Sequence, residues 1–335
     1  DITFNSYGEM TGIYDRREGR ELLKAGERGN RILIFEDRPL EFDAWNIDPT
    51  YKEKWWEFEE PQEFQVLENG PVRGCIYIRR KFLDSVMEQH IYVYKHTARI
   101  DFKTDMDWHE HQMLVKVFFP LDIFCDSASY EIQFGNVKRP THYNTSWDRA
   151  RFETCGHKWA DMSEDGYGAA LLNDCKYGYD IHDSVMSLTL LKSGIFPNPE
   201  ADQGSHSFTY GLFPHQGDFR RGHVMEEAYD LNCPMEGTWV RGTGKENFSF
   251  LQIRESNVFA DTVKRSEKED GIIVRLYEAY GRRTKVHMTV PWAEGRRIME
   301  CGCMEDEWTD MGICRGETEF EMKPYEIKTV KIKNV

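Results

Sequence analysis

Residues 90–102 read HIYVYKHTARIDF, and residues 113–119 read MLVKVFF. In both stretches, apolar and aromatic side chains recur at every second position. The first stretch predicts one face made of Tyr92, Tyr94, Ala98, Ile100 and Phe102, opposite Lys95, Thr97 and Arg99. The second predicts a face made of Met113, Val115, Val117 and Phe119. A period of two is typical of β-strands with one buried face, so these stretches predict strands.

The rest of the chain continues this pattern. Residues 248–253, 272–280, 286–290 and 318–323 alternate or run apolar over strand lengths, and each is bounded by Gly, Pro, Asn or Asp. No window of twelve or more residues gives an amphipathic helix with capping residues. The sequence therefore predicts an all-β chain of many antiparallel strands.

The predicted connections are long, and a boundary divides the chain. Residues 36–62 and 136–168 are expected to be long loops. Loops of this length in compact domains are usually either functional or disordered, and disordered segments avoid tryptophan, so we expect these two loops to be functional. Their tryptophans are Trp45, Trp55, Trp56, Trp147 and Trp159. The text of residues 231–246, LNCPMEGTWVRGTGKE, is rich in glycine. We predict one domain over residues 1–232 and a small β-sandwich over residues 233–335.

Charge and composition exclude some partners. The 43 Lys and Arg residues against 58 Asp and Glu residues give a net charge of −15. This field repels nucleic acid and anionic membranes, and no apolar run reaches the ~18–20 residues that span a bilayer. Aromatic residues make up 13% of the chain, which suits either a large aromatic core or platforms for sugar rings. The eight cysteines are irregularly spaced, which favours buried thiols and a reducing, cytoplasmic location.

Three segments contain residue types that can carry chemistry. In Asp107-Trp108-His109-Glu110-His111, the two histidines would share a strand face and could bind a metal. The alternative of solvent-facing histidines around a core tryptophan is favoured, because no third ligand is identifiable. Residues 139–161 combine Arg, His, Asn, Trp and Asp, the types that bind sugar hydroxyls and rings, or that pin a structural loop. Residues 199–215 place acidic and imidazole groups on both sides of a strand: Asp202, His206 and His215.

At these residues the sequence resembles the C-terminal β-region of glycoside hydrolase family 38 α-mannosidases, specifically the bacterial and cytosolic-type branch. The resemblance covers most of the chain in the family's order, and the block over residues 130–181 is the most specific part. The matching stretches are PLEFDAWNID (39–48), DMDWHEHQMLVKVFFPLDI (105–123), YEIQFGNVKRPTHYNTSWDRARFE (130–153), HKWADMSEDGYGAALLNDCKYGYDI (157–181), PNPEADQGSHSFTYGLFPH (197–215) and VRLYEAYGRR (274–283).

The resemblance implies a galactose-mutarotase-like β-supersandwich followed by a small β-sandwich domain. Family members are multidomain retaining α-mannosidases that act on terminal α-D-mannosyl residues. Their nucleophile and a divalent metal, usually zinc, belong to an N-terminal α/β domain and a helical bundle. The resemblance thus implies an excised fragment, inactive alone, with no catalytic residue, metal ligand or cofactor of its own. Its partners would be the missing N-terminal catalytic and helical domains and a mannose-containing oligosaccharide; a homo-oligomer stays open.

Eight residues within the stretches that resemble the family are predicted to line the rim of the sugar cleft. Their side chains are expected to converge on one edge of the sandwich. They are Asp43, Trp45, Asp48, Arg139, His142, Trp147, Asp202 and His215. Removal of neighbouring domains would also leave an exposed aromatic face, for which Trp45, Trp55, Trp56 and Trp147 are the candidates. The alternative function is a stand-alone carbohydrate-binding or mutarotase-like module, which would use a histidine and a carboxylate as base and acid.

Overall fold

The computed structural model describes residues 1–242, 247–268, 270–306 and 308–333. Strands make up 51% of it and helices 7%, so the all-β prediction is confirmed. By its internal contacts the chain divides into two compact units. Unit 1 comprises residues 1–131 and 137–235, and unit 2 comprises residues 132–136 and 236–335.

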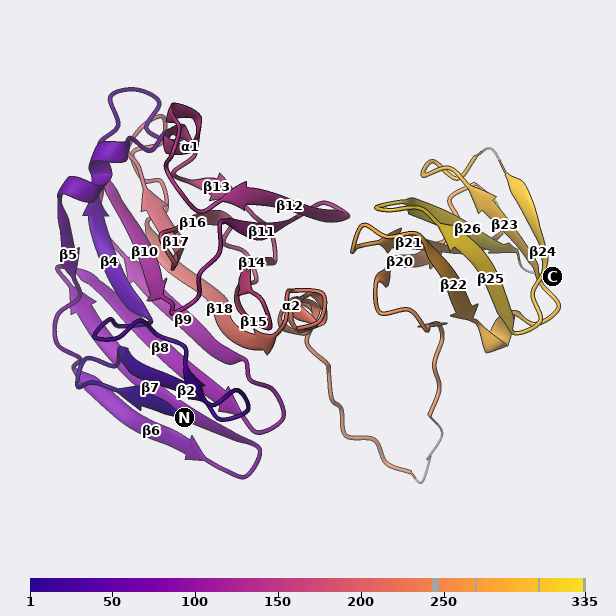
Figure 1. Ribbon diagram of the computed structural model, residues 1–335, viewed down its shortest axis with the longest axis horizontal. Coiled ribbons are helices and arrows are strands. Elements are labelled where there is room, and N and C mark those ends of the chain that lie inside the picture. Colours follow the sequence, from indigo (N-terminus) through magenta and orange to yellow (C-terminus); the bar gives the residue numbers. More distant parts are fainter. Residues whose placement is uncertain (243–246, 269, 307, 334–335) are drawn as a thin grey trace. The chain divides into compact units, whose positions relative to one another are not determined.

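Unit 1 contains three antiparallel sheets, two of them large (Figure 1). The small sheet has the order β1 (Ile2–Phe4), β2 (Met10–Asp15), β3 (Arg20–Glu21). The six-stranded sheet has the order β13 (Thr154–Cys155), β16 (Gly178–His182), β17 (Val185–Ser193), β10 (Met113–Pro120), β4 (Arg31–Glu36), β5 (Trp55–Glu57). The nine-stranded sheet has the order β12 (Gly135–Pro140), β11 (Ser127–Ile132), β14 (Trp159–Glu164), β15 (Tyr167–Asn173), β18 (Gly204–Gln216), β9 (Ile100–Trp108), β8 (Ser85–Tyr94), β7 (Arg73–Phe82), β6 (Glu63–Asn69). Short helices are η1 (Pro49–Glu53), α1 (Ser146–Ala150) and α2 (Val224–Asn232).

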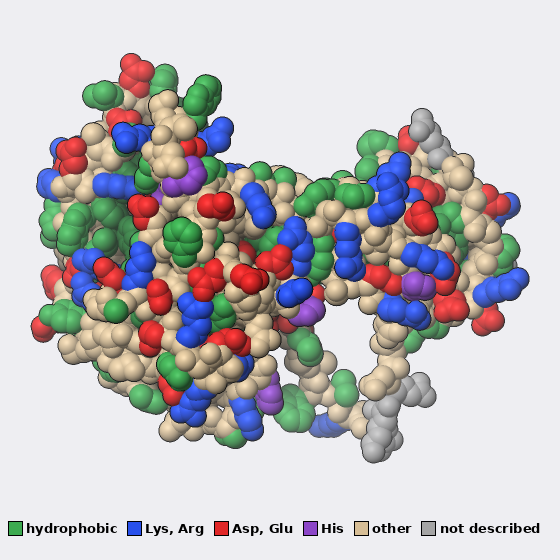
Figure 2. Space-filling view, viewed as in Figure 1, with side chains coloured by type: hydrophobic (Ala, Val, Ile, Leu, Met, Phe, Trp, Pro, Cys, Tyr) green, Lys and Arg blue, Asp and Glu red, His purple; other side chains and the backbone are tan. Residues whose placement is uncertain are grey.

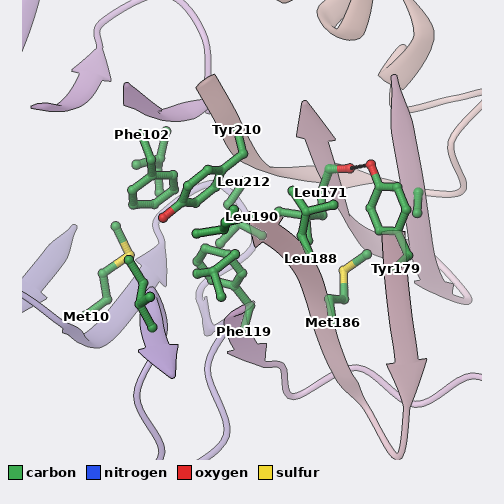
Figure 3. Close-up of a cluster of buried hydrophobic side chains, with 14 of the residues drawn as sticks. Met10, Phe102, Phe119, Leu171, Tyr179, Met186, Leu188, Leu190, Tyr210 and Leu212 are labelled. Atoms are coloured by element: carbon green, nitrogen blue, oxygen red, sulfur yellow. Dashed lines mark hydrogen bonds between the residues drawn. The ribbon is translucent and has the colours of Figure 1, made fainter. Parts of the chain in front are cut away.

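The two large sheets of unit 1 enclose its main core. Phe102 of β9 stacks on Tyr210 of β18 with ring centroids 4.8 Å apart, and it meets Phe119 of β10 at 5.6 Å. Figure 3 shows this cluster together with Leu188 and Leu190 of β17. Burial of aromatic and branched apolar side chains on facing sheets is the main contribution to the stability of such a sandwich.

Strand β10 follows the predicted alternation. Val115, Val117 and Phe119 lie in the core between the sheets, whereas Leu114 and Phe118 face the other side. There they pack with Tyr51 of η1 in a second, smaller apolar cluster. We call this second side the outer face of the six-stranded sheet.

The interpretation of residues 90–102 as one continuous face was wrong. Strand β8 ends at Tyr94 and β9 begins at Ile100, so residues 95–99 connect the two strands of a hairpin. Val93 pairs with Ile100, and the inward residues are Ile91, Ile100 and Phe102. Tyr92 lies on the opposite face, because the connection between the strands resets the alternation.

The two predicted long loops are also more structured than expected. Residues 36–62 contain η1 and β5, and residues 136–168 contain α1, β13, β14 and parts of β12 and β15. These strands are short and carry many polar residues, so their hydrophobic alternation is weak.

Unit 2 contains two antiparallel sheets packed around a separate core. One has the order β19 (Gln252–Ile253), β22 (Thr284–Thr289), β25 (Glu317–Met322). The other has the order β20 (Val258–Arg265), β21 (Gly271–Glu278), β26 (Ile327–Lys333), β23 (Arg297–Cys301), β24 (Thr309–Ile313), and η2 (Pro291–Ala293) follows β22. The predicted stretches 272–280, 286–290 and 318–323 correspond to β21, β22 and β25. Of the predicted stretch 248–253, only residues 252–253 form a strand, β19.

The stretch chosen as the boundary has an irregular backbone from residue 234 to residue 242, and residues 243–246 lie outside the described residues. Lys and Arg side chains are interspersed with Asp and Glu side chains over the face that Figure 2 shows. Among the described helices, none is long and apolar enough to cross a membrane.

Candidate functional site

Charged side chains lie among the apolar ones on the outer face of the six-stranded sheet. Lys116, at the middle of β10, is fully buried, and its Nζ donates to Oε2 of Glu153. The Thr189 hydroxyl of β17 donates to Oε1 of the same carboxylate at 2.5 Å. A buried ammonium needs such a partner, because an unpaired charge in the interior is costly.

A second ionic group surrounds Asp180 of β16. Its carboxylate contacts Lys52 Nζ at 2.9 Å and His182 Nδ1 at 2.6 Å, and the Tyr143 ring stacks on the His182 ring at 3.9 Å. Burial alone would raise the pKa of the Asp180 carboxyl. The hydrogen bonds from His182 and Lys52 and the charge of Lys116 outweigh that effect and lower this pKa to about 2.

A third group lies at the end of β17. Lys192 Nζ donates to the Asp37 carboxylate and, at 2.7 Å, to the backbone carbonyl of Asp43. Asp37 is only 1% exposed, and burial raises the pKa of its carboxyl even though Lys192 opposes this. One buried oxygen of Asp37 and one of Asp43 receive no hydrogen bond within the described part of the chain.

Two of the residues predicted for the cleft rim tie loops together. Asp43 Oδ2 accepts hydrogen bonds from the backbone amides of Ile195 at 2.5 Å and Phe196 at 3.1 Å. Asp48 Oδ2 accepts one from the amide of Leu40 at 3.0 Å. Their carboxylates therefore hold the 37–48 and 194–203 loops in place over the outer face.

Three further predicted residues lie around α1. The Arg139 guanidinium sits 4.5 Å from the centre of the Tyr130 ring; burial lowers the pKa of Arg139, and its buried Nη1 has no described partner. It lines a small cavity with Asp148 and His182. His142 lies 3.7 Å from Asp148, which forms a capping box with Thr145 at the start of α1. Trp147 projects from the same helix and is 75% exposed.

Most of the nominated tryptophans are exposed, as expected of an interaction face. Trp45 is 69% exposed and Trp55 46% exposed, whereas Trp56 packs against the main core. A contiguous apolar patch would indicate an interaction site, whereas singly exposed aromatic side chains are common on protein surfaces, so the interaction face stays a prediction.

Asp202 joins the outer face from the loop before β18. It lines a pocket with Ile47, Glu153 and Lys192, so this loop lies beside the 37–48 loop and β17. Seven of the eight nominated residues thus lie on or around the outer face. Whether any of them binds substrate stays a prediction.

His215 is the exception, and the expectation that it joins the others was wrong. It lies near the C-terminal end of β18, whereas Asp202 precedes the first residue of that strand, Gly204. At ~3.3 Å per residue, the strand separates them by more than 30 Å. His215 is also only 2% exposed, so it cannot line a surface cleft.

The surroundings of His215 explain its burial. Its Nε2 contacts Asp161 at 2.7 Å, and the Ser163 hydroxyl donates to the other Asp161 oxygen at 2.6 Å. The ring is wedged between two glycines: a Cβ at Gly168 would lie 2.6 Å from it, and one at Gly222 only 2.3 Å from it. A histidine and a carboxylate are paired here, as a mutarotase-like module would need, but the pair is closed off by its neighbours.

The sequence reasoning missed the charged groups that organise the outer face. Lys116, Glu153, Asp180 and Lys192 were not nominated, although a signal was present. Lys116 interrupts MLVKVFF between Leu114 and Phe118, on the side of the strand opposite its core residues. A charge inside an otherwise apolar strand indicates a second buried face with a polar partner.

The histidines of the DWHEH segment do not form a metal site with their neighbours. His109 contacts only Asp107 among described carboxylates, at 3.1 Å, and Trp108 is fully buried, as the favoured alternative predicted. Across the described residues, no group of three or more His, Cys, Asp or Glu side chains is placed to hold a metal ion.

Comparison with known families agrees with the two-part fold. Residues 1–200 match the model of the glycosyl hydrolases family 38 C-terminal domain, and residues 257–330 match that of the family 38 C-terminal beta sandwich domain. The chain belongs to glycosyl hydrolase family 38. The predicted family, fold class and C-terminal β-region are therefore confirmed.

Curated relatives in the family carry α-mannosidase names. Alpha-mannosidase G of Dictyostelium discoideum is 36% identical over 98% of this chain, which covers 31% of that protein. Human alpha-mannosidase 2C1 is 36% identical over 88% of this chain and 29% of its own length. The chain thus spans about a third of the length of the relatives it matches. An α-mannosidase structure from Enterococcus faecalis V583 aligns with 99% of this chain and 41% of its own at a TM-score of 0.78 and 17% identity, which shows a shared fold.

Proposed function

We propose that this chain is the C-terminal, substrate-shaping region of a retaining α-mannosidase that hydrolyses terminal α-D-mannosyl residues. Family membership supports the reaction class, and the outer face supports the role. Its loops are tied together by Asp43 and Asp48 and present exposed Trp45, and α1 presents exposed Trp147. Aromatic faces and fixed polar groups are the usual elements of a sugar-binding cleft.

The chemistry of bond cleavage would come from the rest of the enzyme. Retaining hydrolysis needs two carboxyl groups ~5–5.5 Å apart on either side of the glycosidic bond. We infer that the nucleophile and a divalent metal, zinc in our proposal, belong to the catalytic and helical domains. The described residues of this chain do not fit a metal, so we assign no step to one here. We also propose a cytoplasmic location, in keeping with eight cysteines that are all free thiols. The prediction that these thiols are mostly buried was wrong, because only Cys75, Cys301 and Cys314 are buried.

Within this division, the chain would orient the substrate and exclude water. The Lys116–Glu153 and Lys52–Asp180 pairs fix the backbone beneath the loops, so the rim residues are held before substrate arrives. Preorganised groups lose less entropy on binding. Closure by the catalytic domain would lower the local dielectric and strengthen polar contacts at the rim.

An aryl α-mannoside assay on two proteins tests the proposal. The complete enzyme should hydrolyse it, and residues 1–335 alone should not, with or without zinc. Zinc-dependent turnover by the chain alone, abolished by a chelator, would overturn it. Mutarotation of a free sugar by the chain would support the alternative of a sugar-active module.

A further inference from the structure

A small pocket on the outer face has the properties of a sugar-binding subsite. Its volume is about 260 Å³, and its floor is formed by β16 and β17. We call it the Glu153 pocket; the side chains that bear on its chemistry are Glu153, Lys176, Tyr177, Lys192, Asp202 and His206. Ligand pockets are usually ~300 Å³ or larger, so this one suits a single sugar ring.

The polar groups at the base of this pocket are fixed in advance. Glu153 is held by Lys116 and Thr189, and Lys192 is held by Asp37 and the Asp43 carbonyl. The Glu153 side chain is 15% exposed and that of Lys192 18%, so each is partly desolvated. A carboxylate that accepts and an ammonium that donates can bind different hydroxyls of one sugar.

A glycine keeps the pocket open. A Cβ added to Gly178 would lie 3.0 Å from Glu153 Oε1 and 3.2 Å from the Thr189 Cβ. Both distances are too short for ordinary contact, so a side chain there would displace Glu153 or fill the floor. The backbone can therefore approach closely beneath a ligand.

The rim supplies an apolar surface and a free acceptor. Tyr177 is 48% exposed, and its ring meets His157 edge-on at 5.3 Å, which restricts its orientation. The Asp202 carbonyl accepts from His206 Nε2 at 2.9 Å, which braces the loop. The carboxylate of Asp202 is exposed and receives no hydrogen bond from any residue within the described ranges.

These features identify the class of ligand. The side chains of Glu153 and Asp202 balance those of Lys176 and Lys192 around the pocket, which favours a neutral ligand over a phosphate or another anion. Tyr177 offers a ring on which the C–H face of a sugar can pack. We propose that the Glu153 pocket binds one neutral hexose unit of the glycan, other than the mannosyl unit being cleaved. This inference rests on the proposed function, because it takes its substrate class from there.

Kinetics of the complete enzyme with two substrates test the subsite. Tyr177→Ala and Asp202→Asn should each lower kcat/KM for an α-linked mannotriose by about tenfold, mainly through KM, which is ~1.4 kcal/mol of lost binding. Hydrolysis of an aryl α-mannoside, which has no second sugar, should change less than about twofold in Tyr177→Ala. Matched controls are Tyr14→Ala, a 43% exposed tyrosine of β2, and Asp165→Asn, an exposed turn residue.

The outcomes separate this inference from the proposed function. An equal loss on both substrates, or unchanged mannotriose hydrolysis, would overturn the subsite. Titration of residues 1–335 with mannose gives an independent readout by NMR of the Tyr177 ring. Saturable chemical shift changes that are weaker in Asp202→Asn would support the pocket. If the complete enzyme nevertheless cleaves no mannoside, only the proposed function is contradicted. Absence of such shifts at saturating mannose contradicts the pocket.

Discussion

The two faces of the six-stranded sheet bury different kinds of side chains, although the same strands form both faces. The inner face of β10 contributes Val115, Val117 and Phe119 to a continuous apolar core. The outer face places fully buried Lys116 between Leu114 and Phe118 and pairs it with Glu153. Apolar side chains would cover the outer face at less energetic cost, because a buried ion pair often contributes no net stability. We infer from this difference that the inner face specifies the fold and that the charges of the outer face serve a purpose other than stability.

Removal of an inner-face side chain should have the largest effect on the free energy of unfolding. Phe119→Ala should lower the free energy of unfolding by about 3–5 kcal/mol, because the ring leaves a cavity between the two sheets. Urea denaturation followed by tryptophan fluorescence measures the change. Phe124→Ala is the control, because Phe124 is 83% exposed and its loss should cost less than about 0.5 kcal/mol. Similar losses in both variants would contradict the placement of the core.

Breaking the outer-face ion pair should have the next largest effect. Lys116→Met leaves Glu153 without its ammonium partner and should cost about 3 kcal/mol in the same assay. The double variant Lys116→Met/Glu153→Met should recover most of that loss, since it buries no unpaired charge. A double variant as unstable as the single one would show that the pair itself stabilises the fold, and the contrast between the faces would disappear.

Acid titration of Asp180 tests the electrostatics of the outer face. Its pKa is lowered from 3.8 to about 2, so the folded state binds the proton less tightly than the unfolded state does. This contribution is therefore fully present above pH ~4 and is lost as the pH falls through about 2. Between pH ~4 and pH ~2 the free energy of unfolding of the wild type should fall by about 2 kcal/mol more than that of Asp180→Asn, because the amide does not titrate. Parallel pH profiles for the two proteins would contradict the ionic network.

The exposed tryptophans should affect stability least. Trp45→Ala and Trp147→Ala should each change the free energy of unfolding of this chain by less than about 0.5 kcal/mol, because both side chains are mostly in solvent. In the complete enzyme the same variants should lower kcat/KM for mannosides. Stability losses above about 2 kcal/mol in the chain would instead show that the two rings are structural.

The sequence predicts the strands better than it predicts the site. Alternation in residues 113–119 correctly identified the inner face of β10, since burial on one side of a strand imposes a period of two. The same logic failed across residues 95–99, where a connection between strands resets the faces. Motif position brought Asp43 and Asp202 to the same face. It misplaced His215, because partners such as Asp161 are set by cross-strand pairing that no local pattern encodes.

The close packing of His215 against Gly168 and Gly222 also limits which substitutions the family can accept at these positions. Neither Gly168 nor Gly222 has a backbone conformation that demands glycine. At Gly222 the imidazole excludes a side chain, and at Gly168 the imidazole and the Ser163 hydroxyl, 2.4 Å from an added Cβ, both exclude one. A replacement at Gly222 is blocked while the histidine stays, and one at Gly168 is blocked by Ser163 as well. A smaller residue at 215 removes the imidazole from Asp161 and leaves it bonded to Ser163. We therefore expect positions 163, 168, 215 and 222 to vary together among relatives, because a change at one of them is accommodated only when its neighbours change as well.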